Sequence, residues 1–336
     1  LGLTGLSRDI PWGFYIAQLT FLVGVAASAV MVVLPYYLHD YKAFGKITIL
    51  GEFLAIPTVI LCMLFVGVDM GQPQRLANVL LHPTLNSVMF YDFMVLLGYL
   101  FLNIIIARVT FEAERKGVAP PKWIKPVIIL SIPWAISIHT VTAFLYSGLS
   151  GRAFWLTAIL APRFLASAFA SGPSLLILLC LFLRKNTNFD AGDKAIKKLS
   201  QIVAYAMTIN VFFILLELFT VFYSSIPEHM AHFQYLYVGL HGDTTLVPWM
   251  WTSTGLALVA LVGLITPKYR TNLDLLPYIC GAVIISIWID KGMGMVLAGL
   301  TPSPLEEVPG YVPTLPELGI SLALYAFGAF VLTLLY

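Results

Sequence analysis

The stretch PWGFYIAQLTFLVGVAASAVMVVLPYYL at residues 11–38 carries no charged side chain and decides the fold class. An α-helix needs about 20 apolar residues to cross the ~30 Å hydrocarbon core of a bilayer. Runs of roughly 20 or more mostly apolar residues recur along the rest of the chain. We therefore predict nine transmembrane helices, near residues 11–38, 47–69, 87–111, 123–147, 161–184, 199–224, 248–266, 274–298 and 317–336.

The composition supports an all-α polytopic membrane protein. Of the 336 residues, 59% are hydrophobic and 11% are charged, and the mean hydropathy is +0.89. Soluble domains carry about 25% charged residues. These values exclude a soluble enzyme, a disordered chain and a nucleic-acid binder, so the lipid bilayer is the expected environment.

The positions of the charges predict the orientation. Most of the 19 Lys and Arg residues lie in the connections that follow the first, third, fifth and seventh predicted spans, or at their margins. Cytoplasmic loops are enriched in Lys and Arg, so we predict a multi-pass protein of the cytoplasmic membrane with its N-terminus outside. The residues concerned are Lys42, Lys46, Arg108, Arg115, Lys116, Lys122, Lys125, Arg184, Lys185, Lys194, Lys197, Lys198, Lys268 and Arg270.

The three cysteines, Cys62, Cys180 and Cys280, lie far apart and form no CxxC motif. This spacing gives no support for an iron–sulfur cluster, a zinc site or c-type haem attachment in this chain. We interpret the cysteines as apolar packing residues.

The connections predicted on the outer side are long, at 70–86, 148–160, 225–247 and 299–316, and rich in Pro, Gly, His and aromatic residues. Long loops in a compact protein are usually functional. We therefore expect the function to face outward.

A weak internal repeat predicts the domain organisation. Six residues of the first span recur at one constant offset in the fifth, which predicts two parallel four-helix bundles, although chance matches in apolar sequence remain an alternative. The expected domains are residues 1–150, 151–300 and, as an outer loop with a peripheral helix, 301–336. The matched pairs are Trp12 and Trp155, Ile16 and Ile159, Phe21 and Phe164, Leu22 and Leu165, Ala27 and Ala170, and Ser28 and Ser171.

Ionisable residues inside a membrane are costly and often functional. His139 lies in the outer half of its predicted span. A neutral imidazole both donates and accepts a hydrogen bond, which suits a quinone carbonyl and a quinol hydroxyl. The alternative is a structural hydrogen bond to a neighbouring helix. A b-type haem usually takes two axial histidines at membrane depth, and this chain supplies one.

Other buried charges leave two interpretations open. Asp290 and Lys291 lie past the middle of the eighth predicted span and form either a self-neutralised pair or a step in a proton path. Adjacent helix residues point about 100° apart, so they do not simply face each other. Glu52 and Glu217 admit the same structural or proton-path roles.

The outer edge of the first predicted bundle holds further candidates. Trp12 fits an interfacial aromatic belt. Tyr15 and Gln18 can reach into the bundle one turn apart. Asp69 and Arg75 occur in a D-x-G-x-P-x-R run. Arg75 either pairs with Asp69 or meets the acidic surface of a partner.

Several segments together resemble the NrfD/PsrC family, the integral membrane subunits of polysulfide-reductase-like complexes. They are PWG at 11–13, DMGQPQR at 69–75, LLHP at 80–83 and FWLTAILAPRFLASAFASG at 154–172. Other segments are similar to its DsrP branch, the quinone-reactive membrane subunit of the Dsr complex. They are SIHTVTAFLYSGL at 137–149, IPEHMAHFQYL at 226–236, WIDKGMG at 288–294 and SPLEEVPGYVPTLPE at 303–317.

The resemblance implies a subunit without haem or an iron–sulfur cluster that binds menaquinone near the outer face of the first bundle. It implies electron exchange with an extracytoplasmic ferredoxin-like [4Fe–4S] subunit. Further implied partners are a multihaem cytochrome c, a haem b membrane subunit and a cytoplasmic iron–sulfur subunit, in a complex linked to sulfite reduction. Some relatives have ten helices, or a histidine on the first helix that this chain lacks.

From these observations we predict a menaquinol oxidoreductase subunit, with three sets of site residues. The catalytic set is His139, Asp69 and Asp92; the quinone-binding set is Trp12, Tyr15, Gln18, His139 and Arg75; the candidate proton path is Glu52, Glu217, Asp290 and Lys291. The alternatives are a proton-conducting or transporter-like subunit, motivated by the buried charges, and a membrane anchor without its own chemistry.

Overall fold

The computed structural model describes residues 3–39 and 41–336. Within these ranges it is helical, and the only β-type pairing is an isolated bridge between Leu240 and Asp243. Nine helical segments in the described ranges are long and apolar enough to cross a membrane, which confirms the polytopic all-α prediction.

The nine spans begin and end within a few residues of the predicted limits. Three of them contain more than one element: α1, η1 and α2 form the first, η2 and α3 the second, and α12, η5 and α13 the eighth. The elements are α1 (Phe14–Ala26), η1 (Ala27–Ala29), α2 (Val30–Leu38), η2 (Lys42–Phe44), α3 (Gly45–Asp69), α5 (Val88–Arg115), α6 (Ile124–Ser147), α7 (Leu160–Asn186), α8 (Asp193–Ser224), α10 (Val247–Ile265), α12 (Leu276–Ile287), η5 (Trp288–Gly294), α13 (Met295–Leu300) and α14 (Leu315–Leu335).

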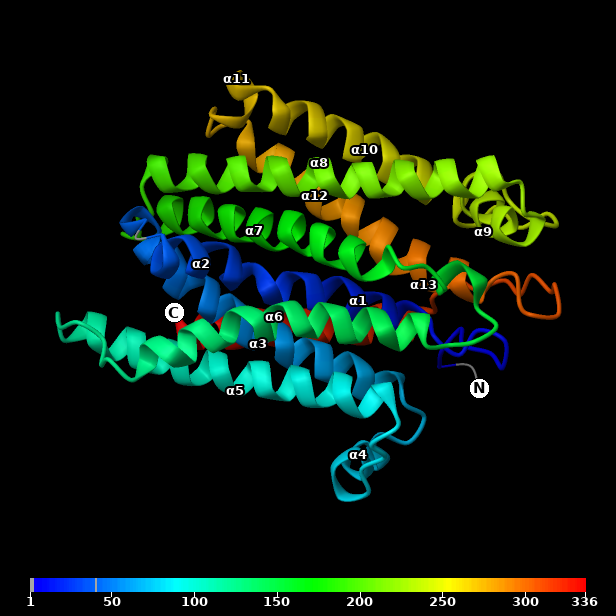
Figure 1. Ribbon diagram of the computed structural model, residues 1–336, viewed down its shortest axis with the longest axis horizontal. Helices are drawn as coiled ribbons and strands as arrows, with labels where there is room; N and C mark the ends of the chain where they lie inside the picture. Colours follow the sequence, from blue (N-terminus) through cyan, green and yellow to red (C-terminus); the bar gives the residue numbers. More distant parts are fainter. Residues whose placement is uncertain (1–2, 40) are drawn as a thin grey trace.

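The spans lie side by side along the long axis of the molecule, so that their connections gather at two ends (Figure 1). The long-loop end carries the connections 70–87, 148–159, 225–246 and 301–314, and the basic end carries 116–123, 187–192 and 266–275. Short helices cover these ends: η3 (Pro73–Ala77), α4 (Asn78–Leu81), η4 (Ala153–Trp155) and α9 (Pro227–Tyr237) at the long-loop end, and α11 (Pro267–Arg270) at the basic end.

The uncharged first span lies at the centre of the molecule, and every side chain of α1 is buried. It packs against α3 and α6 on one side and against α7 and η5 on the other. Helices α3, α5 and α6 pack in sequence, while α7, α8, α10 and α12 pack against one another. The peripheral helix α14 lies along α3.

The two equivalent helices of the predicted repeat, α1 and α7, cross closely. A Cβ atom added to Gly172 would lie 3.1 Å from the Cα of Ser28 and 3.2 Å from the carbonyl oxygen of Gly24. Small residues allow helix backbones to approach in this way in a membrane. The crossing brings the first and the second half of the chain into direct contact.

The eighth span changes its helical type at η5, which is π-helical over Trp288–Gly294. Such segments occur frequently at functional sites. The apolar pattern of the sequence did not predict this change. The π-helical geometry of η5 sets the directions in which Asp290 and Lys291 point.

Candidate functional site

His139 lies on α6 with no exposed surface, and neither ring nitrogen has a hydrogen-bond partner in the protein. Counted from the end of α6 at Ser147, it lies roughly 12 Å from the long-loop end at ~1.5 Å per residue. Buried polar groups are normally hydrogen-bonded, so the two unpartnered nitrogens of this imidazole are unusual and call for an explanation.

A polar ladder leads from His139 to the long-loop end along one face of α6. Thr142 follows His139 by three residues, and Tyr146 follows Thr142 by four. These spacings place all three side chains on that face. Thr142 Oγ1 donates to Asp92 Oδ1 on α5 at 2.6 Å. The hydroxyls of Tyr146 and Thr20 on α1 are hydrogen-bonded at 2.5 Å. We call His139, Thr142, Asp92, Tyr146 and Thr20 the His139 ladder.

Aromatic rings close the outer end of this ladder. The ring of Trp12 lies 5.4 Å from that of Tyr146 and 5.7 Å from that of Trp155, measured between centroids. Trp155 Nε1 donates to the carbonyl oxygen of Met295 at 3.0 Å. Trp12 and Trp155, matched positions of the predicted repeat, therefore pack on each other.

The structure directs Gln18 away from the His139 ladder. Its Oε1 accepts hydrogen bonds from Trp288 Nε1 on η5 and from the Tyr325 hydroxyl on α14, both at 2.8 Å. Its Nε2 donates to the carbonyl oxygen of Phe14 at 3.2 Å. Gln18 thus joins three helices, and the expectation that it points into the first bundle is corrected, because both lone pairs of its oxygen are already used.

Tyr15 and Asp69 both lie at the long-loop end of their helices. The buried Tyr15 ring packs against Phe65 at 6.5 Å, and Tyr15 interacts electrostatically with Asp69. Asp69 Oδ1 is buried and has no hydrogen-bond partner in the protein. Arg75 lies exposed in η3, and within the described ranges no ion pair joins it to Asp69.

Sequence reasoning missed the acidic partner of this cluster, the fully buried Glu317. Its carboxylate accepts hydrogen bonds from the Tyr311 hydroxyl at 2.9 Å and from the backbone N–H groups of Gly5 and Thr314 at 2.9 and 2.7 Å. Burial raises the pKa of Tyr311, and Glu317 adds to this shift. The Thr314-x-x-Glu317 capping box was the signal that could have found it.

A second missed residue, Arg163 on α7, joins two of the predicted proton-path residues. Its Nη1 binds Glu217 Oε2 on α8 at 2.5 Å, and its Nη2 binds both carboxylate oxygens of Asp290 at 2.9 Å. All three side chains are largely buried. The self-neutralised pair of Asp290 with Lys291 is therefore wrong: η5 turns Asp290 towards Arg163.

Lys291 points instead towards the crossing of α1 and α7. It is buried, its Nζ donates to the carbonyl oxygen of Phe164 at 3.3 Å, and the Nζ lies 4.3 Å from the centroid of the Phe164 ring. The two adjacent residues of η5 therefore make different contacts on α7, Asp290 with the Arg163 guanidinium and Lys291 with the carbonyl oxygen and ring of Phe164.

Glu52 lies apart from these contacts, between α3 and α5 and nearer the basic end. Thr110 Oγ1 donates to its Oε2 at 3.1 Å, and its buried Oε1 has no partner in the protein. The structure records no hydrogen bond or ion pair between Glu52 and Glu217, Asp290 or Lys291, all of them described residues. The four do not form one continuous path of direct contacts.

The described residues offer no candidate site for a metal ion. Among residues 3–39 and 41–336 no group of three His, Cys, Asp or Glu side chains is placed to hold a metal ion. Cys62, Cys180 and Cys280 are free and buried.

Comparison with known proteins identifies the family. Residues 2–292 match the family described as polysulphide reductase, NrfD. The relatives include an Archaeoglobus fulgidus protein named Hdr-like menaquinol oxidoreductase integral membrane subunit, which is 23% identical over 93% of this chain and 76% of its own.

Two other relatives show the same percentage of sequence identity to this chain. A Halobacterium salinarum protein, provisionally named as a membrane subunit of dimethyl sulfoxide reductase, is 23% identical over 98% of this chain and 82% of its own. A selenate reductase subunit of Mesobacillus selenatarsenatis is 23% identical over 79% of this chain and 68% of its own. Similarity to the DsrP branch stays a prediction, but the family match covers most of the sequence, and the chain belongs to the polysulfide reductase NrfD family.

Proposed function

We propose that this chain is the quinol-reactive subunit of a membrane-bound oxidoreductase complex, with its N-terminus outside the cytoplasmic membrane. Membership of the NrfD family and a relative named as a menaquinol oxidoreductase membrane subunit support this proposal. The observation that carries it is His139, an imidazole buried at membrane depth with both nitrogens unpartnered in the protein.

In this proposal the menaquinol head group binds in the first domain, residues 1–150, with one oxygen hydrogen-bonded to His139. His139 accepts the hydroxyl proton as the quinol is oxidised. Tyr15, at the buried outer edge, is the candidate for holding the other oxygen.

The protons leave towards the long-loop end. The Thr142–Asp92 pair provides an acceptor one turn from His139, and Asp69, with its unpartnered oxygen, provides a second at the surface. Oxidation of one quinol releases two protons and two electrons. The electrons pass one at a time to an iron–sulfur cluster of a ferredoxin-like subunit docked on the long-loop end, where the exposed Arg75 can meet an acidic surface.

The finer assignment follows the DsrP resemblance. We propose that the complex also contains a multihaem cytochrome c, a haem b membrane subunit and a cytoplasmic iron–sulfur subunit, and that it serves sulfur or sulfite metabolism. The second domain, residues 151–300, and the peripheral segment 301–336 then provide surfaces for these partners.

A second function, proton conduction through the membrane, is favoured by one observation, the Arg163–Glu217–Asp290 cluster buried among α7, α8 and η5. Replacing Glu217 with Gln tests it, because Gln keeps a hydrogen-bonding oxygen and cannot carry a proton. An unchanged number of protons moved per electron removes Glu217 from any path.

The decisive experiment measures bound quinone per polypeptide in the purified complex, together with quinol oxidation. We expect His139→Ala to lose quinol oxidation together with the quinone bound at His139, so that the quinone bound per polypeptide falls. His139→Gln should keep bound quinone through its amide but lose roughly 10²–10⁴-fold in turnover, since it cannot accept a proton. His39→Ala, an exposed histidine at the other end, is the control and should behave as wild type.

The outcomes separate the alternatives. Quinone retained and oxidised normally by His139→Ala returns this residue to a structural role. An intact wild-type complex that neither binds nor oxidises quinol supports the membrane-anchor hypothesis instead.

A further inference from the structure

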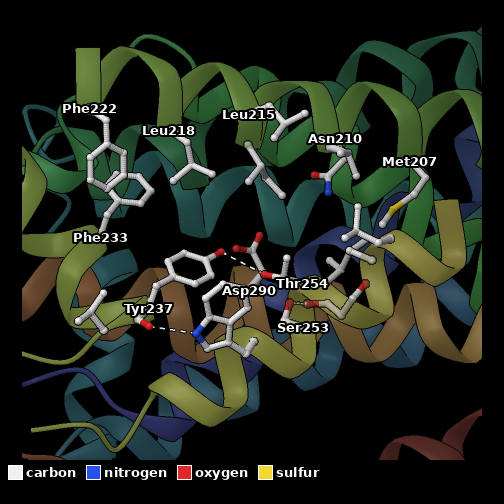
Figure 2. A pocket seen from close by; sticks show the side chains of 18 of the residues that line it. Met207, Asn210, Leu215, Leu218, Phe222, Phe233, Tyr237, Ser253, Thr254 and Asp290 are labelled. Carbon is white, nitrogen blue, oxygen red and sulfur yellow. Dashed lines mark hydrogen bonds between the residues drawn. The ribbon is translucent and has the colours of Figure 1, made fainter. Parts of the chain in front are cut away.

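A cavity of about 430 Å³ lies between α8, α9, α10 and η5 in the second half of the chain. Figure 2 shows α8 forming one wall, from Met207 to Phe222, with Tyr237, Thr254 and Asp290 facing it. At ~1.5 Å per residue this wall is roughly 22 Å long. The cavity is therefore elongated along the helices, and no residue of the His139 ladder lines it.

The walls of this cavity are mainly apolar, and they reach the lipid-facing side of the molecule. Leu215 on α8 and Leu258 on α10 line it and are both more than half exposed. Phe222, Phe233 and Trp251 add aromatic surface. A ligand can therefore enter sideways from the hydrocarbon core, and the aromatic rings can pack against a flat head group.

A few polar groups lie deep in the same cavity. Asn210 is 98% buried, since only 2% of it is exposed, and its Oδ1 has no hydrogen-bond partner in the protein. The hydroxyls of Tyr237 and Thr254 lie 3.3 Å apart. An unpaired buried carbonyl costs about 1–3 kcal/mol, so Asn210 favours a ligand that offers it a donor.

The charges and depth of these groups define the ligand class. Among the described residues that line the cavity there is no Lys or Arg, and the one carboxylate, Asp290, is already bound by Arg163. Asn210 lies roughly 21 Å from the outer end of α8 at ~1.5 Å per residue, well inside the hydrocarbon core. An anionic phospholipid head group fits neither the charge nor the depth. An uncharged ring with hydrogen-bonding oxygens and an apolar chain fits both.

We propose that this cavity is a second binding site for a lipid-soluble quinol, the reduced form of a quinone, because only the quinol has hydroxyl groups that can donate to Asn210 Oδ1. Its ring lies between Asn210 and the Tyr237–Thr254 hydroxyl pair, and its tail leaves between Leu215 and Leu258 into the bilayer. The choice of quinone as the ligand class rests on the proposed function, but the residues are a separate set.

Photolabelling of the complex in native membranes tests the proposal. The probe is a prenylated naphthoquinone that carries a diazirine, the probe and the competing menaquinone are both reduced to the quinol, and the readout is mass spectrometry of the labelled peptides. We expect label in α8 and α10 that excess menaquinone displaces. Ala257→Trp, which fills the cavity, should reduce this label about tenfold, as a loss of ~1.4 kcal/mol in binding does. Val259→Trp, two residues away and outside the lining, should leave it unchanged.

A second, milder variant tests the proposal even if the tryptophan variant misfolds. Asn210→Leu keeps the side-chain volume but removes the acceptor, and it should also reduce the label in α8 and α10. His139→Ala should not, because it lies in the other half of the chain.

Each contrary outcome has its own meaning. Label confined to peptides of residues 1–150 overturns the second site and leaves the proposed function standing. Label in α8 and α10 that survives Ala257→Trp or excess menaquinone overturns it as non-specific. A wild-type complex that takes no label and oxidises no quinol contradicts the proposed function as well.

Discussion

At the scale of single residues, the hydrogen bond from Thr142 holds the buried carboxylate of Asp92 on α5 against α6, one turn from His139. Thr142→Val removes the hydroxyl at nearly constant volume and leaves Asp92 without its donor. We expect a loss of about 1–3 kcal/mol in stability, together with slower quinol oxidation. Thermal unfolding in detergent and steady-state turnover measure the two effects.

The same helix supplies a matched control. Thr140 also donates to the carbonyl four residues before it but makes no bond to another helix. Thr140→Val should therefore change neither quantity. Equal effects of the two substitutions would mean that the loss comes from the helix itself rather than from Asp92.

His232 on α9 gives a prediction for pH. Its buried ring places Nδ1 2.7 Å from the carbonyl oxygen of Ala298 and 3.1 Å from that of Thr301, so Nδ1 carries the hydrogen. Burial lowers the pKa of His232 although these two carbonyls act against the shift. We call α9 docked when His232 makes these two hydrogen bonds and undocked when they are broken. The docked state thus favours the neutral ring, while an undocked His232 titrates near its ordinary pKa of about 6.5.

Above about pH 6.5 both states are neutral and α9 docks fully. As the pH falls below this value, only the undocked state binds the proton, so docking weakens until the lowered pKa is reached. Amide hydrogen exchange over 227–237, corrected for its intrinsic pH dependence, should show less protection at pH 5.5 than at 7.5. In His232→Asn the amide keeps a donor, and this difference should shrink; the charged neighbours of the His232 ring, His229 and Glu228, are unchanged in this variant. An equal pH effect in both proteins excludes His232 as its source.

The residues of the candidate site differ in how well the sequence predicted them. His139 stood out because a lone imidazole inside an apolar run needs a partner. Gln18 was misplaced and Arg163 was missed because their partners lie far away in the chain, on η5 and α14 for Gln18 and on α8 and η5 for Arg163. Glu317 was missed although its capping box is a local signal. Sequence spacing on one helix gives the face of a residue, but it does not say which helix packs there.

At the scale of the helices, the crossing of α1 and α7 leaves no room for a side chain at Gly172. Gly172→Ala places a methyl group against the backbone of α1, and overpacking of this kind costs about 1–3 kcal/mol. Gly255 on α10 has nothing within 4 Å of the added carbon. Gly255→Ala should therefore stabilise its helix by about 0.5–1 kcal/mol.

The opposite signs make this comparison informative, and thermal unfolding of both variants in one detergent measures it. A neutral or stabilising Gly172→Ala would contradict the close crossing.

The limits of the spans followed from the apolar runs alone, because bilayer thickness determines helix length. The π-helical η5 did not, because an apolar run gives the length of a span but not its local helical type.

At the scale of the whole molecule, the distribution of Lys and Arg predicts that the basic end and the long-loop end lie on opposite sides of the membrane. The free cysteines Cys62, Cys180 and Cys280 are buried, which gives a low background for thiol labelling. Ser150→Cys and Asn86→Cys place an exposed thiol at the long-loop end, while Ala119→Cys and Thr271→Cys place one at the basic end.

A membrane-impermeant maleimide should label the first pair in intact cells and the second pair only after permeabilisation, because the proposed orientation puts the long-loop end outside. Two positions at each end guard against one thiol being covered by a partner protein. The reverse pattern would place the long-loop end, and with it the exit of the His139 ladder, in the cytoplasm. The electron acceptor would then have to be a cytoplasmic protein, since quinol electrons leave from the end that the ladder reaches.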